Sequence, residues 1–220
     1  MKNVVDSSKK IYIVGAGGLG KEVYCALRGQ FGWDNSASKV IFAEEDSFFK
    51  LRKVLGVDVI SLSDVDPMDA LILIAIGDIR ARERISSSLV YESKFAILLD
   101  QSVNITPFTS LGDGSIVLGP SFLSVDVKVG KHAVINPGTT ISHDCTIGNF
   151  FTASPGVNVS GGCKIGDRVF MGTNSCVRNG VTICDDAIIG MGSVVTKDIL
   201  SRGTYIGNPA KSIIHQDEVQ

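Results

Sequence analysis

Residues 128–172 read KVGKHAVINPGTTISHDCTIGNFFTASPGVNVSGGCKIGDRVFMG, with an apolar residue at every sixth position. The period continues in both directions without a slip and includes Leu99, Ile105, Leu111, Val117, Leu123, Val129, Ile135, Ile141, Ile147, Ala153, Val159, Ile165, Met171, Val177, Ile183, Ile189 and Val195. In a chain with 44% hydrophobic residues, chance would produce this run with a probability on the order of one in a million. The period of six is therefore a property of the fold.

A period of six fits neither an amphipathic helix nor a simple alternating strand. It does fit a triangular coil in which each side is one short strand followed by a turn. The aliphatic residue then points into the prism, and successive coils stack at the ~4.8 Å spacing of paired strands. The alternative is an antiparallel sandwich, but its strands usually recur every ~8–12 residues with variable turns. The constant period favours an all-β parallel β-helix.

Three segments of this repeat resemble the bacterial hexapeptide acyltransferases: IGNFFTASPGV (147–157), IGDRVFMGTNSCV (165–177) and IIGMGSVVTKDI (188–199). The resemblance covers residues 100–211. It implies a left-handed coil and a homotrimer in which acyl-CoA lies in the groove between neighbouring prisms. The period by itself predicts neither the handedness nor the trimer.

The first part of the chain has a different pattern. KIYIVGAGGLGKEVYCAL (10–27) predicts a strand over Ile11–Val14, a glycine-rich turn and a helix beginning near Gly20. Alternating elements of this kind predict a small parallel, Rossmann-like α/β domain; the further strands are expected at Lys39–Phe42, Leu71–Ile76 and Phe95–Leu98, and a helix at Arg80–Val90. We therefore predict an N-terminal tail (1–9), an α/β domain (10–100), a β-helix (101–198) and a C-terminal segment (199–220).

Gly15, Gly17 and Gly20 form a G-x-G-x-x-G motif, which lets a backbone approach a phosphate group at a helix N-terminus. A dinucleotide oxidoreductase is one interpretation, but this domain holds only half of a full dinucleotide fold. A nucleotide-sugar also carries a pyrophosphate. We expect Gly15, Gly17 and Gly18 to bind such a substrate.

Two further segments end predicted strands at the same edge of the sheet. Glu44 and Glu45 follow the second strand, and Gly77 and Arg80 follow the third. All four are candidate contacts to a ribose or base. The alternative for the first segment is a solvated turn, and for the second a helix N-cap, Asp78, followed by a surface arginine.

The α/β domain combined with the β-helix resembles the sialic-acid O-acetyltransferase-like family over nearly the whole chain. The better understood members of this family N-acetylate nucleotide-linked 4-amino-4,6-dideoxyhexoses in bacterial glycan synthesis. The resemblance implies that the small domain binds the nucleotide-sugar, with UDP or dTDP favoured over GDP. It also implies that the β-helix binds acetyl-CoA as a co-substrate.

His143 and Asp144 are the candidate catalytic residues. An amine must lose a proton as it attacks a thioester, and a neutral imidazole is suited to accept that proton near pH 7. An adjacent carboxylate can orient the ring and stabilise the imidazolium. The pair resembles the family's general base and its acidic neighbour, which implies direct attack without an acyl-enzyme.

The same resemblance implies the cofactor contacts. The glycine matching Gly161 donates its amide to the thioester carbonyl, and positions matching Thr152, Thr173 and Met191 line the acyl-CoA site. Lys211 closes the segment Gly207–Lys211, where the adenine end of the cofactor commonly rests. Several relatives carry a second histidine in place of Thr152. The contact between that histidine and the cofactor is therefore expected to be absent here.

Composition limits the remaining classes. With 21 basic and 23 acidic residues and no basic block, nothing indicates a nucleic-acid or membrane partner. No signal peptide is visible, and five cysteines without a CxxC pair fit reduced thiols in a cytoplasm.

The histidines are His132, expected on the outer wall without a role, His143 and His215 in the tail. Their spacing lacks the three zinc ligands of a γ-class carbonic anhydrase, so no metal is expected. A sugar O-acetyltransferase and a non-catalytic nucleotide-sugar scaffold remain alternatives.

Overall fold

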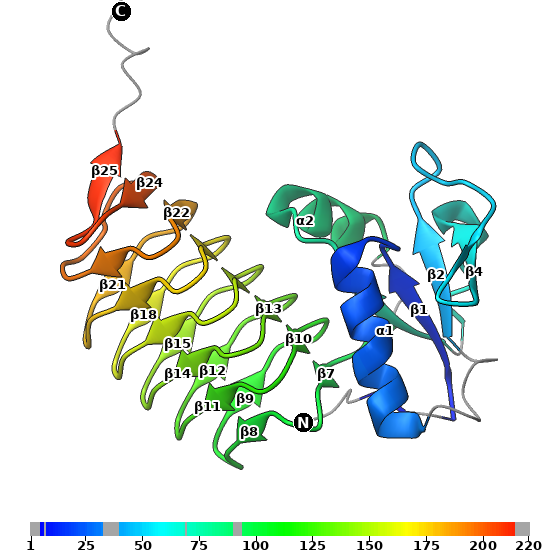
Figure 1. Ribbon diagram of the computed structural model, residues 1–220, viewed down its shortest axis with the longest axis horizontal. Coiled ribbons are helices and arrows are strands. Elements are labelled where there is room, and N and C mark those ends of the chain that lie inside the picture. The colour runs from blue at the N-terminus through cyan, green and yellow to red at the C-terminus, as the bar shows by residue number, and fades with distance from the viewer. Residues whose placement is uncertain (1–4, 7, 33–39, 69, 90–93, 214–220) are drawn as a thin grey trace, which may run out of the picture.

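A computed structural model of the chain describes residues 5–6, 8–32, 40–68, 70–89 and 94–213. An α/β domain and a left-handed parallel β-helix lie side by side in it (Figure 1). His215, most of the expected N-terminal tail, and the predicted element ends Lys39 and Val90 lie outside the described residues. No helix in the described part of the chain is long and apolar enough to cross a bilayer.

The α/β domain is built on one sheet with the order β3-β4-β2-β1-β5-β6. Its elements are β1 (Lys10–Val14), α1 (Gly18–Phe31), β2 (Val40–Glu44), β3 (Lys53–Val54), β4 (Val57–Ser61), the 3-10 turn η1 (Leu62–Asp64), β5 (Ala70–Ile74), α2 (Ile79–Ser88) and β6 (Lys94–Phe95). The central strands β2, β1 and β5 are parallel. They read as continuous apolar runs because both faces of a covered parallel sheet are buried.

The strands expected at Ile11–Val14, Lys39–Phe42 and Leu71–Ile76 are found as β1, β2 and β5, and the two expected helices are found as α1 and α2. The antiparallel pair β3 and β4 was not predicted, because a two-residue strand and a short one separated by Leu55 and Gly56 leave a weak periodic signal. The turn between them holds both residues at positive φ, 50° and 79°.

The strand expected over Phe95–Leu98 was wrong. β6 ends at Phe95 and pairs with β5, whereas Leu98 begins β7 and pairs with β10 of the β-helix. Ala96 and Ile97 are buried in the crossing between the two sheets. One apolar run thus serves two cores, which a sequence pattern cannot distinguish from a single buried strand.

The β-helix is a triangular prism with three parallel sides. The first side contains β7 (Leu98–Leu99), β10 (Ile116–Val117), β13 (Val134–Ile135), β16 (Thr152–Ala153), β19 (Phe170–Met171) and β22 (Ala187–Ile189). The second contains β8 (Asn104–Ile105), β11 (Phe122–Leu123), β14 (Thr140–Ile141), β17 (Asn158–Val159), β20 (Cys176–Val177) and β23 (Val194–Val195). The third contains β9 (Ser110–Leu111), β12 (Lys128–Val129), β15 (Thr146–Ile147), β18 (Lys164–Ile165) and β21 (Thr182–Ile183).

Each strand pairs with the strand three elements later, so that Val134 lies over Ile116 and Thr152 lies over Val134. At the end of the prism far from β7, β24 (Gly203–Ile206) extends the first side and β25 (Lys211–Ile213) pairs with it antiparallel (Figure 1).

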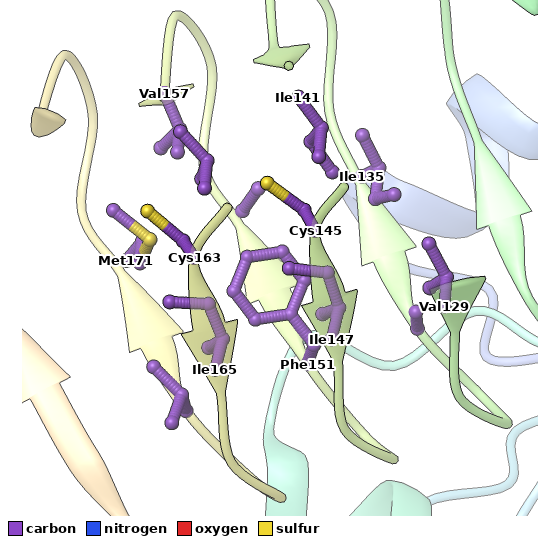
Figure 2. Close-up of a cluster of buried hydrophobic side chains, with 14 of the residues drawn as sticks. Val129, Ile135, Ile141, Cys145, Ile147, Phe151, Val157, Cys163, Ile165 and Met171 are labelled. Atoms are coloured by element: carbon purple, nitrogen blue, oxygen red, sulfur yellow. The ribbon is translucent and has the colours of Figure 1, made fainter. Parts of the chain in front are cut away.

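The predicted inward column forms the core of the prism. Figure 2 shows Val129, Ile135, Ile141, Ile147 and Ile165 pointing into the interior together with Cys145, Val157 and Cys163. Phe151 is also fully buried there. The thiols of Cys145 and Cys163 are free, buried and inward-facing, as expected for cysteines that act as small apolar residues.

The α/β domain packs against the first side of the prism. Leu98, Ile116 and Leu118 belong to the prism but are buried in the core of the α/β domain. This apolar contact fixes the two domains against each other.

The sequence predicted that His132 lies on the outer wall of the prism. It lies instead in this contact between the two domains. It is 5% exposed, and its ring packs edge-on against Phe95 and parallel to Phe150. The repeat pattern places its side chain outside the prism, but the α/β domain covers that part of the surface. Burial, followed by the nearby charge of Arg82, lowers the pKa of His132 from 6.5 to about 4.

Candidate active site

His143 and Asp144 occupy the turn between β14 and β15, at the corner where the second side meets the third. Asp144 has a φ of 60°, which aspartate tolerates better than most residues. This turn directs both side chains outward, 62% and 66% exposed, and brings Nδ1 of His143 to 2.7 Å from Oδ2 of Asp144. The pair leaves Nε2 of the imidazole directed away from Asp144.

Gly161 lies at the same corner, one coil further along. The amide of Gly162 donates to the carbonyl of His143 at 2.8 Å, which holds the two turns together. A Cβ on Gly161 would lie 2.7 Å from Nε2 of His143. Among the described residues, nothing accepts a hydrogen bond from the amide of Gly161. A backbone donor and an imidazole nitrogen therefore meet at one exposed place.

The other expected cofactor residues do not join this corner within one chain. Thr173 and Met191 are exposed and lie in the turns after β19 and β22, where the first side meets the second. Lys211 is exposed at the start of β25.

Thr152 is only 4% exposed, on the first side under α2. Its hydroxyl accepts a hydrogen bond from Nη2 of Arg82 at 2.7 Å. The structure thus gives Thr152 a buried partner within its own chain. A contact between Thr152 and a cofactor stays a prediction.

The glycine motif forms a pocket of about 380 Å³ in the α/β domain. Gly15, Gly17, Gly18, Glu44, Glu45 and Gly77 all line it, so six of the seven predicted substrate residues come together. Helix α1 begins at Gly18 without a side-chain cap, and its N-terminal amides are directed at this pocket. A phosphate group is the natural ligand of such a helix end.

The four glycines of the segment 15–20 have different reasons for lacking a side chain. Gly15 has a φ of 108°, and a Cβ there would lie 2.6 Å from the carbonyl oxygen of Ala75. A Cβ on Gly20 would overlap the carbonyl oxygen of Gly15. Positions 17 and 18 face open space. The outer glycines allow close packing of helix and strand, and the middle ones keep the pocket open.

The two glutamates line the pocket with their carboxylates already held. Glu44 accepts two hydrogen bonds from Arg52, at 2.6 and 2.7 Å, and Glu45 pairs with Arg84 of α2. The hydrogen bond from Arg84 lowers the pKa of Glu45. Arginine side chains thus hold both carboxylates in place at the pocket wall. Phe48, 69% exposed, adds an apolar surface there that the sequence interpretation did not single out.

Arg80 lies apart from the pocket. It lines a second cleft of about 350 Å³ between α2 and the prism, together with Asp78, Arg168 and Asp186. It pairs with Asp186 at 2.5 Å, and Arg168 binds the same carboxylate through Nε at 2.9 Å. The N-cap interpretation of Asp78 is confirmed, since its side chain accepts from the amide of Ala81 at 2.7 Å. Gly77 lines both cleft and pocket.

Among the described residues, no cluster of three histidines, cysteines or carboxylates has the geometry to hold a metal ion. The imidazole of His143 and the neighbouring amide of Gly161 can together support proton transfer with a backbone hydrogen-bond donor beside it.

The comparisons with known proteins agree with both halves of the structure. Residues 10–89 match the PglD N-terminal domain, and residues 162–197 match the hexapeptide repeat of succinyl-transferase. WeeI from Acinetobacter baumannii is 30% identical, covers 93% of this chain and 99% of its own, and superimposes with a TM-score of 0.85. The chain belongs to the hexapeptide-repeat sugar acetyltransferases.

Two further members of this acetyltransferase family have been solved with ligands. PerB from Caulobacter crescentus, in complex with CoA and GDP-perosamine, is 30% identical over 93% of this chain and 97% of its own, with a TM-score of 0.83. The acetyltransferase domain of PglB from Neisseria gonorrhoeae, in complex with acetyl coenzyme A, is 27% identical over 93% of this chain and 99% of its own, with a TM-score of 0.84. A comparison with curated protein sequences gives no match.

For an acetyltransferase of this family, the positions of the two candidate sites in one chain are informative. The α/β domain covers the first side and the turns that carry His132 and Phe150, between the third and first sides. His143 lies at the corner between the second and third sides, which is opposite the first side. The glycine pocket and His143 of the same chain therefore do not face each other.

Proposed function

We propose that this protein transfers an acetyl group from acetyl-CoA to the 4-amino group of a nucleotide-linked 4-amino-4,6-dideoxyhexose. The main support is the presence, in one chain, of a phosphate-binding glycine pocket and an exposed histidine–carboxylate pair next to a free backbone amide. PerB, whose structure contains CoA and GDP-perosamine, is similar over nearly the whole chain.

In this reaction His143 is the general base. The amine nitrogen attacks the thioester carbonyl, and Nε2 of His143 accepts the proton that the nitrogen loses. Asp144, at 2.7 Å from Nδ1, holds the ring and stabilises the imidazolium. The amide of Gly161 donates to the developing oxyanion. When the C–S bond breaks, the imidazolium returns its proton to the CoA thiolate, so no acyl-enzyme forms.

The active site is composed from two subunits of a homotrimer. Within one chain, Thr173 and Met191 lie at one corner of the prism and His143 and Gly161 at another. A head-to-tail, three-fold contact brings the corner with Thr173 and Met191 of one prism beside the corner with His143 of its neighbour. Acetyl-CoA then contacts both corners at once, and the sugar bound by one subunit reaches His143 of the partner subunit.

The nucleotide is the open part of the substrate. The family resemblance favours UDP or dTDP, whereas PerB was solved with GDP-perosamine. The glycine pocket recognises the pyrophosphate, which all three carriers share. Glu44, Glu45 and Phe48 line the same pocket, and we expect them to contact the nucleoside.

Incubation with acetyl-CoA and a panel of UDP-, dTDP- and GDP-linked 4-amino sugars, followed by mass spectrometry, tests the proposal. One acetyl group should appear on the amine, and His143→Ala should lower turnover by a factor of ~10² or more while the protein stays folded. Acetylation of a hydroxyl would instead identify an O-acetyltransferase. Absence of any product, with no heat on titration with CoA, would identify a nucleotide-sugar scaffold.

A further inference from the structure

Arg82 is the largest side chain buried completely among the described residues, at 0% exposure. It lies on α2, at the side of the α/β domain that faces the prism (Figure 1). Burial lowers the pKa of Arg82 to about 10, so the group stays charged at neutral pH. In the described part of the chain no carboxylate accepts a hydrogen bond from it. A buried charge without a carboxylate partner is costly and needs a reason.

One edge of the guanidinium binds the wall of the glycine pocket. Nη1 of Arg82 donates to the carbonyl of Ile76 at 2.6 Å and to that of Gly77 at 3.3 Å. Both residues line the pocket between β5 and α2.

The other edge binds the prism. Nε of Arg82 donates to the carbonyl of His132 at 3.0 Å, and Nη2 donates to the carbonyl of Phe150 at 3.0 Å and to Thr152 at 2.7 Å. These acceptors belong to two successive coils, since His132 and Phe150 occupy equivalent turns. All five N–H groups of the guanidinium are thus used, and lysine supplies only three in a different geometry.

The other polar contacts between α2 and the prism are weaker. Arg80 is 65% exposed where it meets Asp186, and Glu83 lies 3.5 Å from Arg168 near the surface. Ion pairs that solvent reaches in this way contribute little to fixing a geometry. Among the described residues, Arg82 makes the buried polar connection between the wall of the pocket and the prism.

We propose that Arg82 is a positioning residue for acetyl transfer. It fixes the wall of the glycine pocket to the prism and so sets how far the amino group of a bound nucleotide-sugar reaches towards His143 of the partner subunit. The inference rests on the function proposed above. Displacement of a reacting group by about 1 Å can cost about 10²-fold in rate, so loosening this connection affects the rate more than binding.

The test compares Arg82→Met and Arg82→Lys with Ile85→Val. Ile85 is a buried residue of the same helix that packs on the sheet and not on the prism. Three quantities are measured: the Kd of the free nucleoside diphosphates UDP, dTDP and GDP, kcat and KM for the nucleotide-linked amine, and acetyl transfer to the same amino sugar without its nucleotide. The free sugar does not need the pocket.

We expect Arg82→Met to lower kcat about 100-fold and Arg82→Lys about tenfold, with KM, Kd and transfer to the free sugar within about threefold of the wild type. Ile85→Val should lower the melting temperature without changing kcat. If Arg82→Met does not fold, the lysine variant carries the test.

A folded lysine variant with unchanged kcat would overturn the inference alone. So would an equal loss of transfer to the free and the nucleotide-linked sugar, because that pattern means general structural damage. Wild-type protein that acetylates no nucleotide-linked amine would contradict the proposed function, and this inference with it.

Discussion

The imidazole of His143 rests over the α-carbon of Gly161, with no space for a side chain between them. A Cβ at position 161 would lie 2.7 Å from both Cε1 and Nε2 of the ring. The contact joins two turns stacked at one corner of the prism. Because the ring is 62% exposed, it can move away from an intruding methyl group at little cost in stability.

Gly161→Ala should therefore displace His143 without unfolding the protein. We expect turnover to fall about 10- to 100-fold, since a general base must stay within hydrogen-bond reach of the proton that it accepts. The melting temperature should change by no more than a few degrees. Steady-state kinetics and a thermal melt measure the two effects.

The His143→Ala background is the control for this variant. Adding Gly161→Ala to a chain without the imidazole should cause only the small further loss that belongs to the backbone donor. If the two losses multiply in full, the methyl group acts on something other than the position of His143.

The burial of His132 predicts that the contact between the two domains is sensitive to acid. Its pKa falls from 6.5 to about 4 on folding, chiefly because it is buried, with Arg82 and Lys131 adding to the shift and Asp113 opposing it. Between these pH values the unfolded chain binds a proton that the folded chain does not. Protonation of His132 therefore does not lower the free energy of unfolding above about pH 6.5. As the pH falls towards 4, the free energy of unfolding decreases by roughly 2–4 kcal/mol.

His132→Phe keeps an aromatic ring beside Phe95 and Phe150 but does not titrate. Denaturant unfolding at pH 7 and pH 4.5 should show a smaller loss of stability for this variant than for the wild type. The comparison uses the difference between the two pH values, so any strain of phenylalanine at a φ of 54° cancels. Equal losses would mean that other groups cause the acid sensitivity.

The sequence predicts the prism almost completely because its core is a strict repeat. Each aliphatic of the six-residue column has one place to go, and the stacking of Val134 on Ile116 and of Thr152 on Val134 follows from the same period. The proximity of His143 and Asp144 follows from their adjacency. The glycine motif likewise predicts its pocket, since G-x-G-x-x-G requires close packing of helix on strand.

Arg82 and the burial of His132 could not be predicted in this way. The repeat treats the three outer sides as equivalent, whereas the α/β domain covers only one of them. A readable signal does exist in the outward positions. The first side carries Ile116, Val134, Thr152, Phe170 and Ile188, whereas the third side carries Ser110, Lys128, Thr146, Lys164 and Thr182. An apolar outer column indicates the covered side, although not which arginine joins it.

The glycine motif gives a pair of contrasting variants. Gly20→Ala forces a methyl group into the carbonyl of Gly15 and should destabilise the α/β domain by about 1–3 kcal/mol. Gly18→Leu meets no protein atom at its Cβ, so it should fold normally and instead fill the pocket. Titration with UDP, dTDP and GDP should show at least about tenfold weaker binding for Gly18→Leu, with an unchanged melting temperature. A Gly18→Leu protein that binds like the wild type would remove the pocket from substrate recognition.

Mixed trimers test whether two subunits share each active site. Gly18→Leu chains lack a working pocket and His143→Ala chains lack the base, so each variant alone should be nearly inactive. When both are co-expressed, a Gly18→Leu chain supplies His143 to the intact pocket of its His143→Ala neighbour. About one site in four then has both parts, because a closed three-fold ring draws each part from a different chain. Recovery of roughly a quarter of wild-type turnover is expected after co-expression, but none after mixing preformed trimers that do not exchange subunits. A co-expressed sample as inactive as either parent would place the pocket and the histidine of each site in the same chain.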